Sequence, residues 1–446
     1  MTSDPDPRRV VLELLLEKGE FPTRRFAVAV EAAGLEGRDR AFARHLLAGA
    51  IRHRRTLDAL FKPFCARPRV DEAVLWTLRL AIFQRFWMDQ VPSYAAFGAT
   101  LESAKPVLKK ALGFANAVLR SVDRALTGEL PFDAPAAADV LHAGTRAWSF
   151  DRDLFPDPAE DPLGHAAVTL SYPDELAVRW QAAHGLERTV TRMRLSNRPP
   201  VLCLRINPLR ADAESVRAGL AAAGLESHAG PSPGTLLLDQ PGGDLRRLPG
   251  FAAGFWSVQD LSALRSVRLA DPRPGERVLD WCAAPGGKSL AAIEHAGGEL
   301  EVHACDVDHG RLARVEPEAL RLGHSIHTQV IGADGADLPP GPWDLILLDV
   351  PCTNTGVLGK RPEARWRFRR AKLAEAVATQ RRIADAASRA LGPTTRVLWT
   401  TCSLEEEENR GGAEYLAARS GLRIEDQRCF EPDAESSGGY AALLLP

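Results

Sequence analysis

The sequence of 446 residues lacks the features of membrane, secreted and zinc-stabilised proteins. No apolar run reaches the roughly 18 residues that a membrane span needs, and the first ten residues hold acids and prolines where a signal peptide is basic and then apolar. The seven cysteines include no Cys-x-x-Cys pair, which argues against a structural zinc site and for reduced single thiols. We therefore expect a cytoplasmic protein with no membrane partner and no bound metal.

Strong net charge is also missing, because the formal net charge is only −2. The charges are unevenly distributed, however. Residues 1–130 contain 21 of the 56 Lys and Arg but only 15 of the 58 Asp and Glu. This basic front end is compatible with phosphate contacts. A solvated, arginine-rich helical surface would explain the same charges equally well.

Hydrophobic spacing divides the chain into four parts. Residues 1–130 have apolar residues at helical spacing and predict an all-α bundle of roughly six or seven helices. Residues 131–165 are rich in Pro, Ala and Asp and predict a linker with little core of its own. Residues 166–255 mix short helices with the strand candidates VLCLRIN and TLLLDQ, and predict a small α+β unit.

Residues 256–446 alternate short apolar strands with helices. The strand candidates are RVLDWCA, LEVHACDV, IHTQVIGAD, WDLILLDVP and TRVLWTTCS. Parallel strands need long crossover connections, and helices commonly provide them. The alternation therefore predicts a Rossmann-like domain with a parallel sheet covered by helices on both faces.

The stretch DWCAAPGGKS, residues 280–289, follows a predicted strand and opens a predicted helix. Its small residues let a ligand approach the backbone, and a helix N-terminus offers free N–H groups. A Walker A loop would need Gly where Cys282 stands, and Gly-x-Gly-x-x-Gly is absent, so the ligand carries no pyrophosphate. The candidate cofactor-binding residues of this loop are Cys282, Ala283, Ala284, Pro285, Gly286, Gly287 and Lys288.

Acidic residues follow the next predicted strands. Asp306 is placed to accept hydrogen bonds from a ribose, Asp334 to hold an adenine amino group, and Asp349 closes a third strand. Each of them taken singly is equally well explained as a helix N-cap. Their recurrence at one sheet edge favours a shared ligand with ribose, adenine and amino-acid-like groups. We therefore expect S-adenosylmethionine as the cofactor.

Two cysteines, Cys352 and Cys402, also end predicted strands at this edge. A lone cysteine is more often a small buried apolar residue than a nucleophile. We keep that interpretation for Cys65, Cys203, Cys305 and Cys429. For Cys352 and Cys402 their position favours a chemical role.

Methylation at carbon 5 of a cytosine would use all of these groups. A thiolate that adds to carbon 6 makes carbon 5 nucleophilic, an acid near ring nitrogen 3 assists the addition, and a base later removes the carbon 5 proton. Cys402, Asp349 and Cys352 are candidates for these roles. The cytosine must be flipped out or single-stranded to be reached.

Several motifs resemble those of the RsmB/NOP family of RNA cytosine-carbon-5 methyltransferases, the Sun/Fmu and NOL/NOP type. From about residue 200 to 430, these motifs are VLCLRINPLR, SVQDLSAL, CAAPGGK, ACDVD, DVPCTNTGV, KRPEARWR and TTCSLEEEEN, in the family's order. The resemblance implies that Cys402 is the nucleophile and that Cys352 assists release of the product. One departure is Thr353-Asn354, where the family usually has Ser-Gly or Ser-Ala after the Pro-Cys.

The N-terminal bundle resembles the RNA-binding antitermination factor NusB. The similar residues are Val91-Pro92-Ser93 and the stretch GFANAVLR, residues 113–120. A NusB-like domain joined to this catalytic unit is similar to the RsmB-type members, which implies an RNA partner, namely a cytosine in 16S ribosomal RNA.

Two alternatives remain at this point. The chain could be a NusB-like RNA-binding scaffold with an inactive methyltransferase domain, but that hypothesis predicts the loss of a catalytic residue. It could instead be a DNA cytosine methyltransferase, but those enzymes use the Pro-Cys cysteine as nucleophile and are expected to lack the Thr-Cys-Ser motif. The sequence therefore favours RNA over DNA as the substrate.

Overall fold

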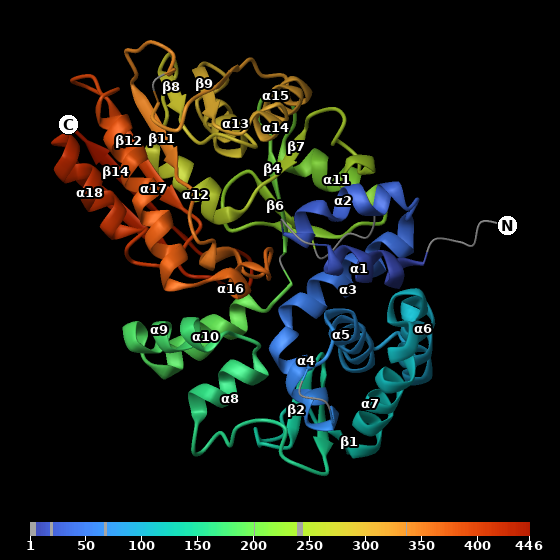
Figure 1. The fold of residues 1–446 in the computed structure, drawn as a ribbon. Helices are drawn as coiled ribbons and strands as arrows, with labels where there is room; N and C mark the ends of the chain where they lie inside the picture. Colours follow the sequence, from blue (N-terminus) through green and yellow to red (C-terminus); the bar gives the residue numbers. More distant parts are fainter. Residues whose placement is uncertain (1–5, 18–20, 67–68, 200, 239–243, 336) are drawn as a thin grey trace. The chain divides into compact units, whose positions relative to one another are not determined.

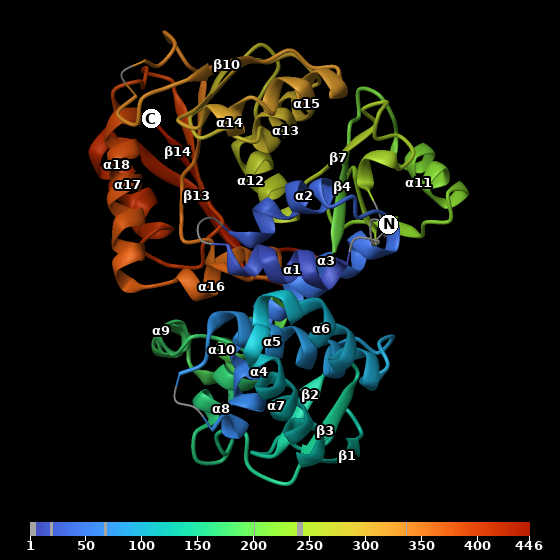
Figure 2. The same cartoon turned by 45° about the vertical axis from the view of Figure 1, so that its right-hand side comes forward.

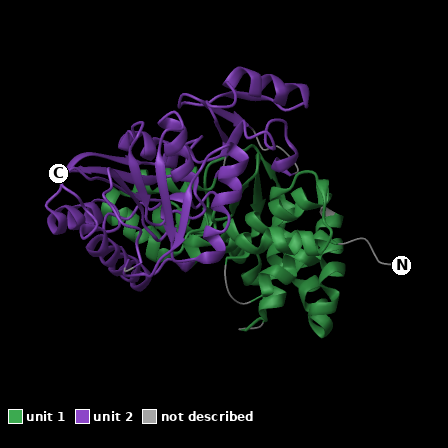
Figure 3. Ribbon diagram, turned by 90° about the horizontal axis from the view of Figure 1, so that it is seen from above, with its two compact units in different colours: residues 1–197, 361–366 green, residues 198–360, 367–446 purple. Residues whose placement is uncertain are grey.

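The computed structural model describes residues 6–17, 21–66, 69–199, 201–238, 244–335 and 337–446. The chain forms two compact units (Figures 1 and 3). Unit 1 comprises residues 1–197 and 361–366, and unit 2 comprises residues 198–360 and 367–446. Among the described residues, we find no helix with the length and apolar character that a bilayer crossing requires.

Unit 1 begins with the predicted helical bundle. In the described part of the chain its helices are α1 (Pro7–Leu16), α2 (Pro22–Ala32), α3 (Gly37–Arg52), α4 (Arg54–Phe61), α5 (Glu72–Trp87), α6 (Ser93–Leu108) and α7 (Leu112–Ala125), with short 3-10 turns at Lys62–Phe64 and Lys109–Ala111. Helix α1 starts where Pro7 needs no N–H partner and the Asp6 carboxylate accepts the Arg8 N–H. Helix α5 is buried on nearly all sides, which makes it the centre of the bundle.

The segment 131–165 is not the linker that its composition predicts. Strands β1 (Leu126–Leu130), β2 (Val140–Ala143) and β3 (Arg146–Phe150) form a small antiparallel sheet in the order β1-β3-β2. Leu141, Trp148 and Phe150 of this sheet join the core of the helical bundle. Pro and Ala are depleted in strands, so the composition of this segment did not indicate a sheet. Its few large apolar residues are nevertheless buried in the core.

Three further helices complete unit 1, so it ends at residue 197 and not at the expected boundary of 165. They are α8 (Pro162–Thr169), α9 (Asp174–His184) and α10 (Leu186–Ser196). The short segment 361–366 also belongs to this unit. Its fully buried Arg365 donates to the Asn197 side chain at 2.7 Å and lies 4.2 Å from the centre of the Tyr172 ring.

Unit 2 starts with the small α+β part that the sequence predicts. Its elements are β4 (Leu202–Ile206), α11 (Ala213–Ala222), β5 (Ser227–Ala229), β6 (Thr235–Leu238), a 3-10 turn at Leu245–Arg247 and β7 (Trp256–Val258). The strands pair antiparallel in the order β5-β6-β4-β7, and α11 packs Val216 and Leu220 against them. Asp239 and Gln240, the last residues of the strand candidate TLLLDQ, lie outside the described residues.

The rest of unit 2 is built on a seven-stranded sheet in the described residues. Its strands are β8 (Arg277–Asp280), β9 (Glu301–Asp306), β10 (His327–Val330), β11 (Leu345–Asp349), β12 (Arg396–Thr401), β13 (Arg423–Phe430) and β14 (Gly439–Leu445). Their order is β10-β9-β8-β11-β12-β14-β13. The first five are parallel, as predicted. Strand β14 is antiparallel to both of its neighbours, β12 and β13, so the sheet is mixed.

Helices cover both faces of this sheet, as expected. They are α12 (Leu261–Ala270), α13 (Gly287–His295), α14 (His309–Leu312), α15 (Val315–Leu322), α17 (Arg370–Ser388) and α18 (Arg410–Ser420). The short helix α16 (Ala364–Arg367) lies almost wholly in the segment that belongs to unit 1. Along β11, Leu345 and Leu347 pack with α12, α13 and α15, whereas Ile346 and Leu348 pack with α17 and α18. Figures 1 and 2 show these two sets of helices on opposite sides of the strands. Burial on both faces explains why these strands read as continuous apolar runs.

The packing of β3 generates a stability prediction for unit 1. Trp148 is 7% exposed and meets Phe86 edge-on at 5.6 Å between ring centres, whereas Phe132 in the same segment is 55% exposed. Trp148→Ala should lower the free energy of unfolding by about 3–5 kcal/mol because it leaves a cavity. Phe132→Ala should change it by less than about 0.5 kcal/mol. Equal midpoints of thermal unfolding for the two variants would indicate that residues 131–165 are a linker after all.

Candidate active site

The parallel strands bring most of the predicted site residues to one edge of the sheet. Asp280, Asp306 and Asp349 are the last residues of β8, β9 and β11, and Cys402 follows β12 directly. Strand β10 ends at Val330, so Asp334 lies in the loop beyond it with its side chain exposed. This edge carries the carboxyl ends of the strands, where open α/β sheets bind their ligands.

The expected cofactor loop turns sharply between β8 and α13. Gly286 has φ of +94°, a conformation that side chains rarely adopt, and α13 begins at the next residue. The loop is held from both sides, because the Ser289 hydroxyl donates to Asp280 at 2.6 Å and the Ala284 N–H donates to Asp306 at 3.1 Å. The loop backbone is therefore fixed at the start of a helix, where an anionic group can be bound.

Asp280, the first residue of the stretch DWCAAPGGKS, has no predicted role. It is 1% exposed, and burial raises the pKa of its carboxyl group to about 7. Its Oδ1 atom has no hydrogen-bond partner among the described residues. A buried polar atom without a partner is costly, so a donor from a bound ligand would be favourable here. The position of Asp280 at the end of the first strand was the available signal.

Asp306 supports the neighbouring backbone and is not itself the N-cap of the next helix, which is the alternative that was open for each acid. Its Oδ1 accepts the Asp308 N–H at 2.9 Å, and Asp308 is the N-cap of α14. A carboxylate has about four acceptor positions, and these internal bonds use two of them. Asp306 can therefore support the loop and still accept a hydrogen bond from a ligand.

Lys288 and Asp349 form an ion pair at the centre of this edge. Lys288 Nζ lies 2.7 Å from Asp349 Oδ2, and the Thr400 hydroxyl donates to Asp349 Oδ1 at 2.9 Å. Burial acts to lower the pKa of Lys288, but the Asp349 carboxylate and, to a smaller extent, Cys402 outweigh it and raise that pKa. Lys288 is therefore a stable cation close to Cys402.

The two candidate cysteines face each other across the β11–β12 pair. Their Sγ atoms are 3.2 Å apart, within hydrogen-bond distance for sulfur. The hydrogen bond to Cys402, together with burial, raises the pKa of Cys352 well above its usual value. Burial also raises the pKa of Cys282 well above its usual value, so the cysteine of the cofactor loop stays a thiol. Either thiol can donate in this contact, and the closeness of Cys402 disfavours loss of the Cys352 proton.

A buried glutamate joins the loops that carry the two cysteines. Glu408 is fully buried and accepts hydrogen bonds from the Thr353 N–H at 2.9 Å, the Ser403 hydroxyl at 2.5 Å and the Gln380 amide at 3.2 Å. The Thr353 hydroxyl donates to it as well. Thr353 follows Cys352 and Ser403 follows Cys402, so Glu408 connects the two cysteine loops directly.

Asn354 explains part of the departure from the family's Ser-Gly pattern. Its φ is +62°, in the left-handed region where Gly is usual and Asn is the side chain most often tolerated. Its amide Nδ2 donates to the Cys352 carbonyl at 2.7 Å, which orients the amide group. Its Oδ1 then accepts the Cys402 thiol hydrogen at 3.3 Å. The substitution keeps the backbone turn and adds a polar atom at the thiol.

The run of four glutamates was the least informative part of the Thr-Cys-Ser motif. Such a run is usually a solvated surface, and Glu406 and Glu407 are exposed as that interpretation expects. Glu405 and Glu408 are 2% and 0% exposed. In the sequence, only their spacing of three residues and the Asn409 that follows separate these two glutamates from the exposed ones.

Comparison with known families gives three matches along the chain. The NusB family matches residues 7–124, the ferredoxin-like domain of RsmF/B-like methyltransferases matches residues 172–244, and 16S rRNA methyltransferase RsmB/F matches residues 267–446. The predicted fold of a NusB-like bundle, a small middle domain and a Rossmann-like methyltransferase domain is confirmed.

Curated relatives cover most of the chain. The ribosomal RNA small subunit methyltransferase B of Salmonella arizonae is 31% identical over 83% of this chain and 80% of its own length. The probable ribosomal RNA small subunit methyltransferase B of Synechocystis is 29% identical over 93% and 89%. That of Bacillus subtilis is 29% identical over 91% and 84%.

Solved structures share the fold at lower identity. PH0851 has a TM-score of 0.78 and 22% identity, with complete coverage of both chains. NSun6 from Pyrococcus horikoshii, solved with SFG, has a TM-score of 0.56 and 21% identity over 61% of this chain and 98% of its own. The expected cofactor, S-adenosylmethionine, is confirmed by the family. This chain belongs to the ribosomal RNA small subunit methyltransferase B family.

Proposed function

We propose that this enzyme transfers a methyl group to carbon 5 of a cytosine in 16S ribosomal RNA, with Cys402 as the nucleophile. The observation that carries the proposal is the pair of thiols, 3.2 Å apart, beside the ion pair of Lys288 and Asp349. Covalent activation of a cytosine needs a nucleophilic thiol and, around it, groups that can hold or move protons and stabilise charge. The second thiol, the Lys288 cation and the Asp349 carboxylate can fill these roles.

The residues at the sheet edge fit the cofactor. Its amino group and hydroxyls are donors, which suits the carboxylates of Asp306, Asp334 and Asp349, and the unpartnered Oδ1 of Asp280 offers a further acceptor. Its carboxylate suits the N-terminus of α13 and the loop of residues 282–288. When bound, S-adenosylmethionine supplies an electrophilic methyl group. The protein residues hold and orient it at the edge where the thiols lie.

The cation and the neighbouring thiol favour Cys402 as the attacking group. Lys288 stabilises a negative charge on Cys402, and Cys352 keeps its own proton and can donate a hydrogen bond to that charge. Cys402 therefore loses its proton to solvent more readily than Cys352. The thiolate, and not the thiol, is the nucleophile.

The proton transfers can then be balanced. Addition of Cys402 to carbon 6 is accompanied by transfer of a proton from solvent to ring nitrogen 3, and this proton returns to solvent when the sulfur–carbon bond is cleaved. In between, the Asp349 carboxylate accepts a hydrogen bond from the nitrogen 3 N–H. After methyl transfer, the sulfur of Cys402 is bonded to carbon 6 and no longer carries a negative charge. The pKa of Cys352, which Cys402 had raised, is therefore lowered. Cys352 then gives its proton to solvent and takes the one from carbon 5. Cleavage of the sulfur–carbon bond returns the Cys402 thiolate and frees nitrogen 3 of its proton.

The RNA substrate follows from the relatives and from the N-terminal unit. The relatives are named for small-subunit ribosomal RNA, and the NusB match coincides with the arginine-rich front of the chain. The presence of Cys402, Cys352 and Asp349 argues against an inactive scaffold, and the Thr-Cys-Ser motif argues against DNA. Such an enzyme would work in the cytoplasm, where ribosomal RNA is processed.

Replacing each of the two cysteines should have a different effect on the reaction. Cys402→Ala should abolish methyl transfer, because no adduct forms. Cys352→Ala should accumulate a covalent protein–RNA adduct, because addition proceeds and the carbon 5 proton is not removed. Denaturing gel electrophoresis with labelled RNA and cofactor measures both. Cys429→Ser, at an exposed cysteine, serves as the control. An adduct with Cys402→Ala and none with Cys352→Ala would reverse the roles.

Asn354→Gly should change the pH dependence of the reaction. The bond from the Cys402 thiol to Asn354 exists only while Cys402 is protonated, so it stabilises the unreactive form. Without it the thiolate forms at lower pH, and the acid side of the kcat profile should move down by about half a unit to one unit. Gly tolerates the positive φ, so the loop should keep its conformation. A shift to higher pH would contradict this role for Asn354.

The nucleic acid can be tested directly. Bisulfite mapping of 16S ribosomal RNA from a strain without this protein should lose one 5-methylcytosine, which returns with the wild-type gene and not with Cys402→Ala. Matched RNA and DNA oligonucleotides around that site should be methylated only as RNA. Methylation of the DNA alone would exclude the proposed substrate.

A further inference from the structure

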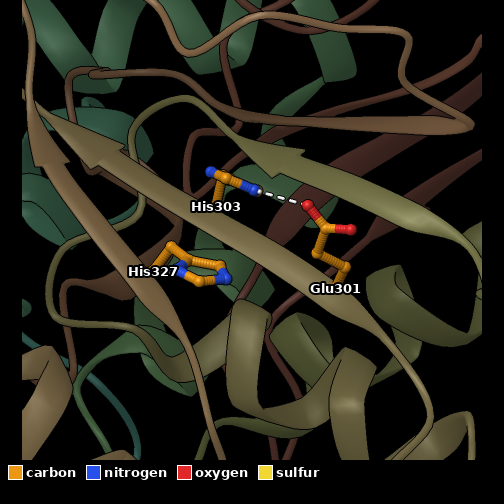
Figure 4. A group of neighbouring side chains, drawn as sticks. All are labelled: Glu301, His303 and His327. Carbon is orange, nitrogen blue, oxygen red and sulfur yellow. Dashed lines mark hydrogen bonds and ion pairs between the residues drawn. The ribbon is translucent and has the colours of Figure 1, made fainter.

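A second cluster of chemically capable side chains lies on unit 2, at the other end of the sheet. Glu301 and His303 are on β9, two residues apart and therefore on the same face. His327 is on β10, directly opposite His303 in the register of the parallel pair. Figure 4 shows the three side chains grouped on these two strands.

The donor atoms of this cluster lie close together. One ligand atom from each residue lies within 4.8 Å of the other two. His303 Nε2 is 2.9 Å from Glu301 Oε1, and the two imidazole rings are stacked with centres 4.6 Å apart. Zinc binds nitrogen and oxygen at about 2.0–2.2 Å, so its ligand atoms lie within roughly 4.2 Å of each other. Small side-chain rotations would close the remaining gap.

The donor set selects a class of metal. Two imidazoles and one carboxylate suit borderline transition metals such as Zn²⁺, whereas Mg²⁺ and Ca²⁺ prefer oxygen alone. We propose that Glu301, His303 and His327 form a binding site for a divalent transition metal of the Zn²⁺ class, with water completing the coordination. The cysteine spacing gave no reason to expect a metal. This site uses none of the cysteines. Strand pairing brings together two histidines that are distant in the sequence.

Arg277 modulates the proposed site. Its guanidinium lies 4.8 Å from the centre of the Trp343 ring and donates to Glu301 Oε1 at 3.0 Å. The same guanidinium places a positive charge beside the ion. Arg277 therefore orients the carboxylate and at the same time weakens metal binding.

The site is separate from the proposed methyl-transfer chemistry. Glu301 lies five residues and His303 three residues before Asp306 on β9, so about 10–16 Å of strand separates this cluster from the cofactor edge. Strand β10 is the edge of the sheet and pairs only with β9 among the described strands. A metal held by His303 and His327 would cross-link that edge strand to its neighbour.

Titration of the full-length chain with ZnCl₂ tests the proposal. The experiment uses a Cys352→Ser, Cys402→Ser background, so that the paired thiols do not compete for zinc. Calorimetry should show one zinc per chain, and His327→Ala should weaken binding roughly tenfold or more. Co²⁺ bound at the same site should give a d–d spectrum without the thiolate charge-transfer band. Binding that survives His327→Ala, or no stoichiometric binding at all, would overturn the proposal.

Two further variants make the test specific. His295→Ala removes a histidine of the same unit that also bonds a carboxylate, Asp271 at 3.1 Å, and should leave zinc affinity unchanged. Arg277→Met removes the competing charge and should tighten binding severalfold. Weaker binding in Arg277→Met would contradict the proposed role of Arg277. Circular dichroism of each variant checks that the fold is intact.

Discussion

The pairing of β11 with β12 is the constraint on which the active site depends. Asp349, the last residue of β11, lies opposite Thr400, and the two cysteines follow within a few residues of that pair. Because both strands are parallel, their loops leave the sheet at the same edge. A shift of this register by one residue would turn the side chains to the other face and separate the thiols.

A buried carboxylate connects the loops beyond this pair by hydrogen bonds. Burying Glu408 is costly unless its oxygens are hydrogen-bonded, and they accept from Thr353, Ser403 and Gln380. Burial still raises the pKa of Glu408, so the network does not fully compensate for desolvation. A network of this kind rigidifies a loop only when nearly all of its members are satisfied. The cost is consistent with a demand for accurate placement of two sulfur atoms.

The charge of the sheet edge also accounts for the ligand that it accepts. Asp280, Asp306 and Asp349 end neighbouring strands, and Lys288 is held by one of them. Such an edge repels a pyrophosphate, in agreement with the missing Walker A and dinucleotide patterns. It suits a cofactor that presents an amino group, hydroxyls and a sulfonium. Lys288 lies close to Cys402, where the proposed reaction requires a stabilised negative charge.

The sequence by itself predicted the methyltransferase family and the residues of the proposed site, because residues at strand ends form short local motifs. The loop of residues 282–288, the acids after β9 and β11, and the two cysteines could all be identified from short patterns. The parallel part of the sheet could be predicted for the same reason, since buried strands are continuous apolar runs. The last two strands of that sheet, β13 and β14, and the small sheet of β1, β2 and β3 were missed. Whether such short segments form strands depends on the surfaces that they pack against.

Only the tertiary structure decided which polar residues are buried and which histidines meet. Glu406 and Glu408 belong to the same acidic run, yet one is exposed and the other is fully buried between two loops. Asn354 looked like a departure from the family, and its positive φ shows why it is tolerated. His303 and His327 are far apart in the sequence and become neighbours through strand register. Burial and register depend on the whole fold, so no local pattern could contain them.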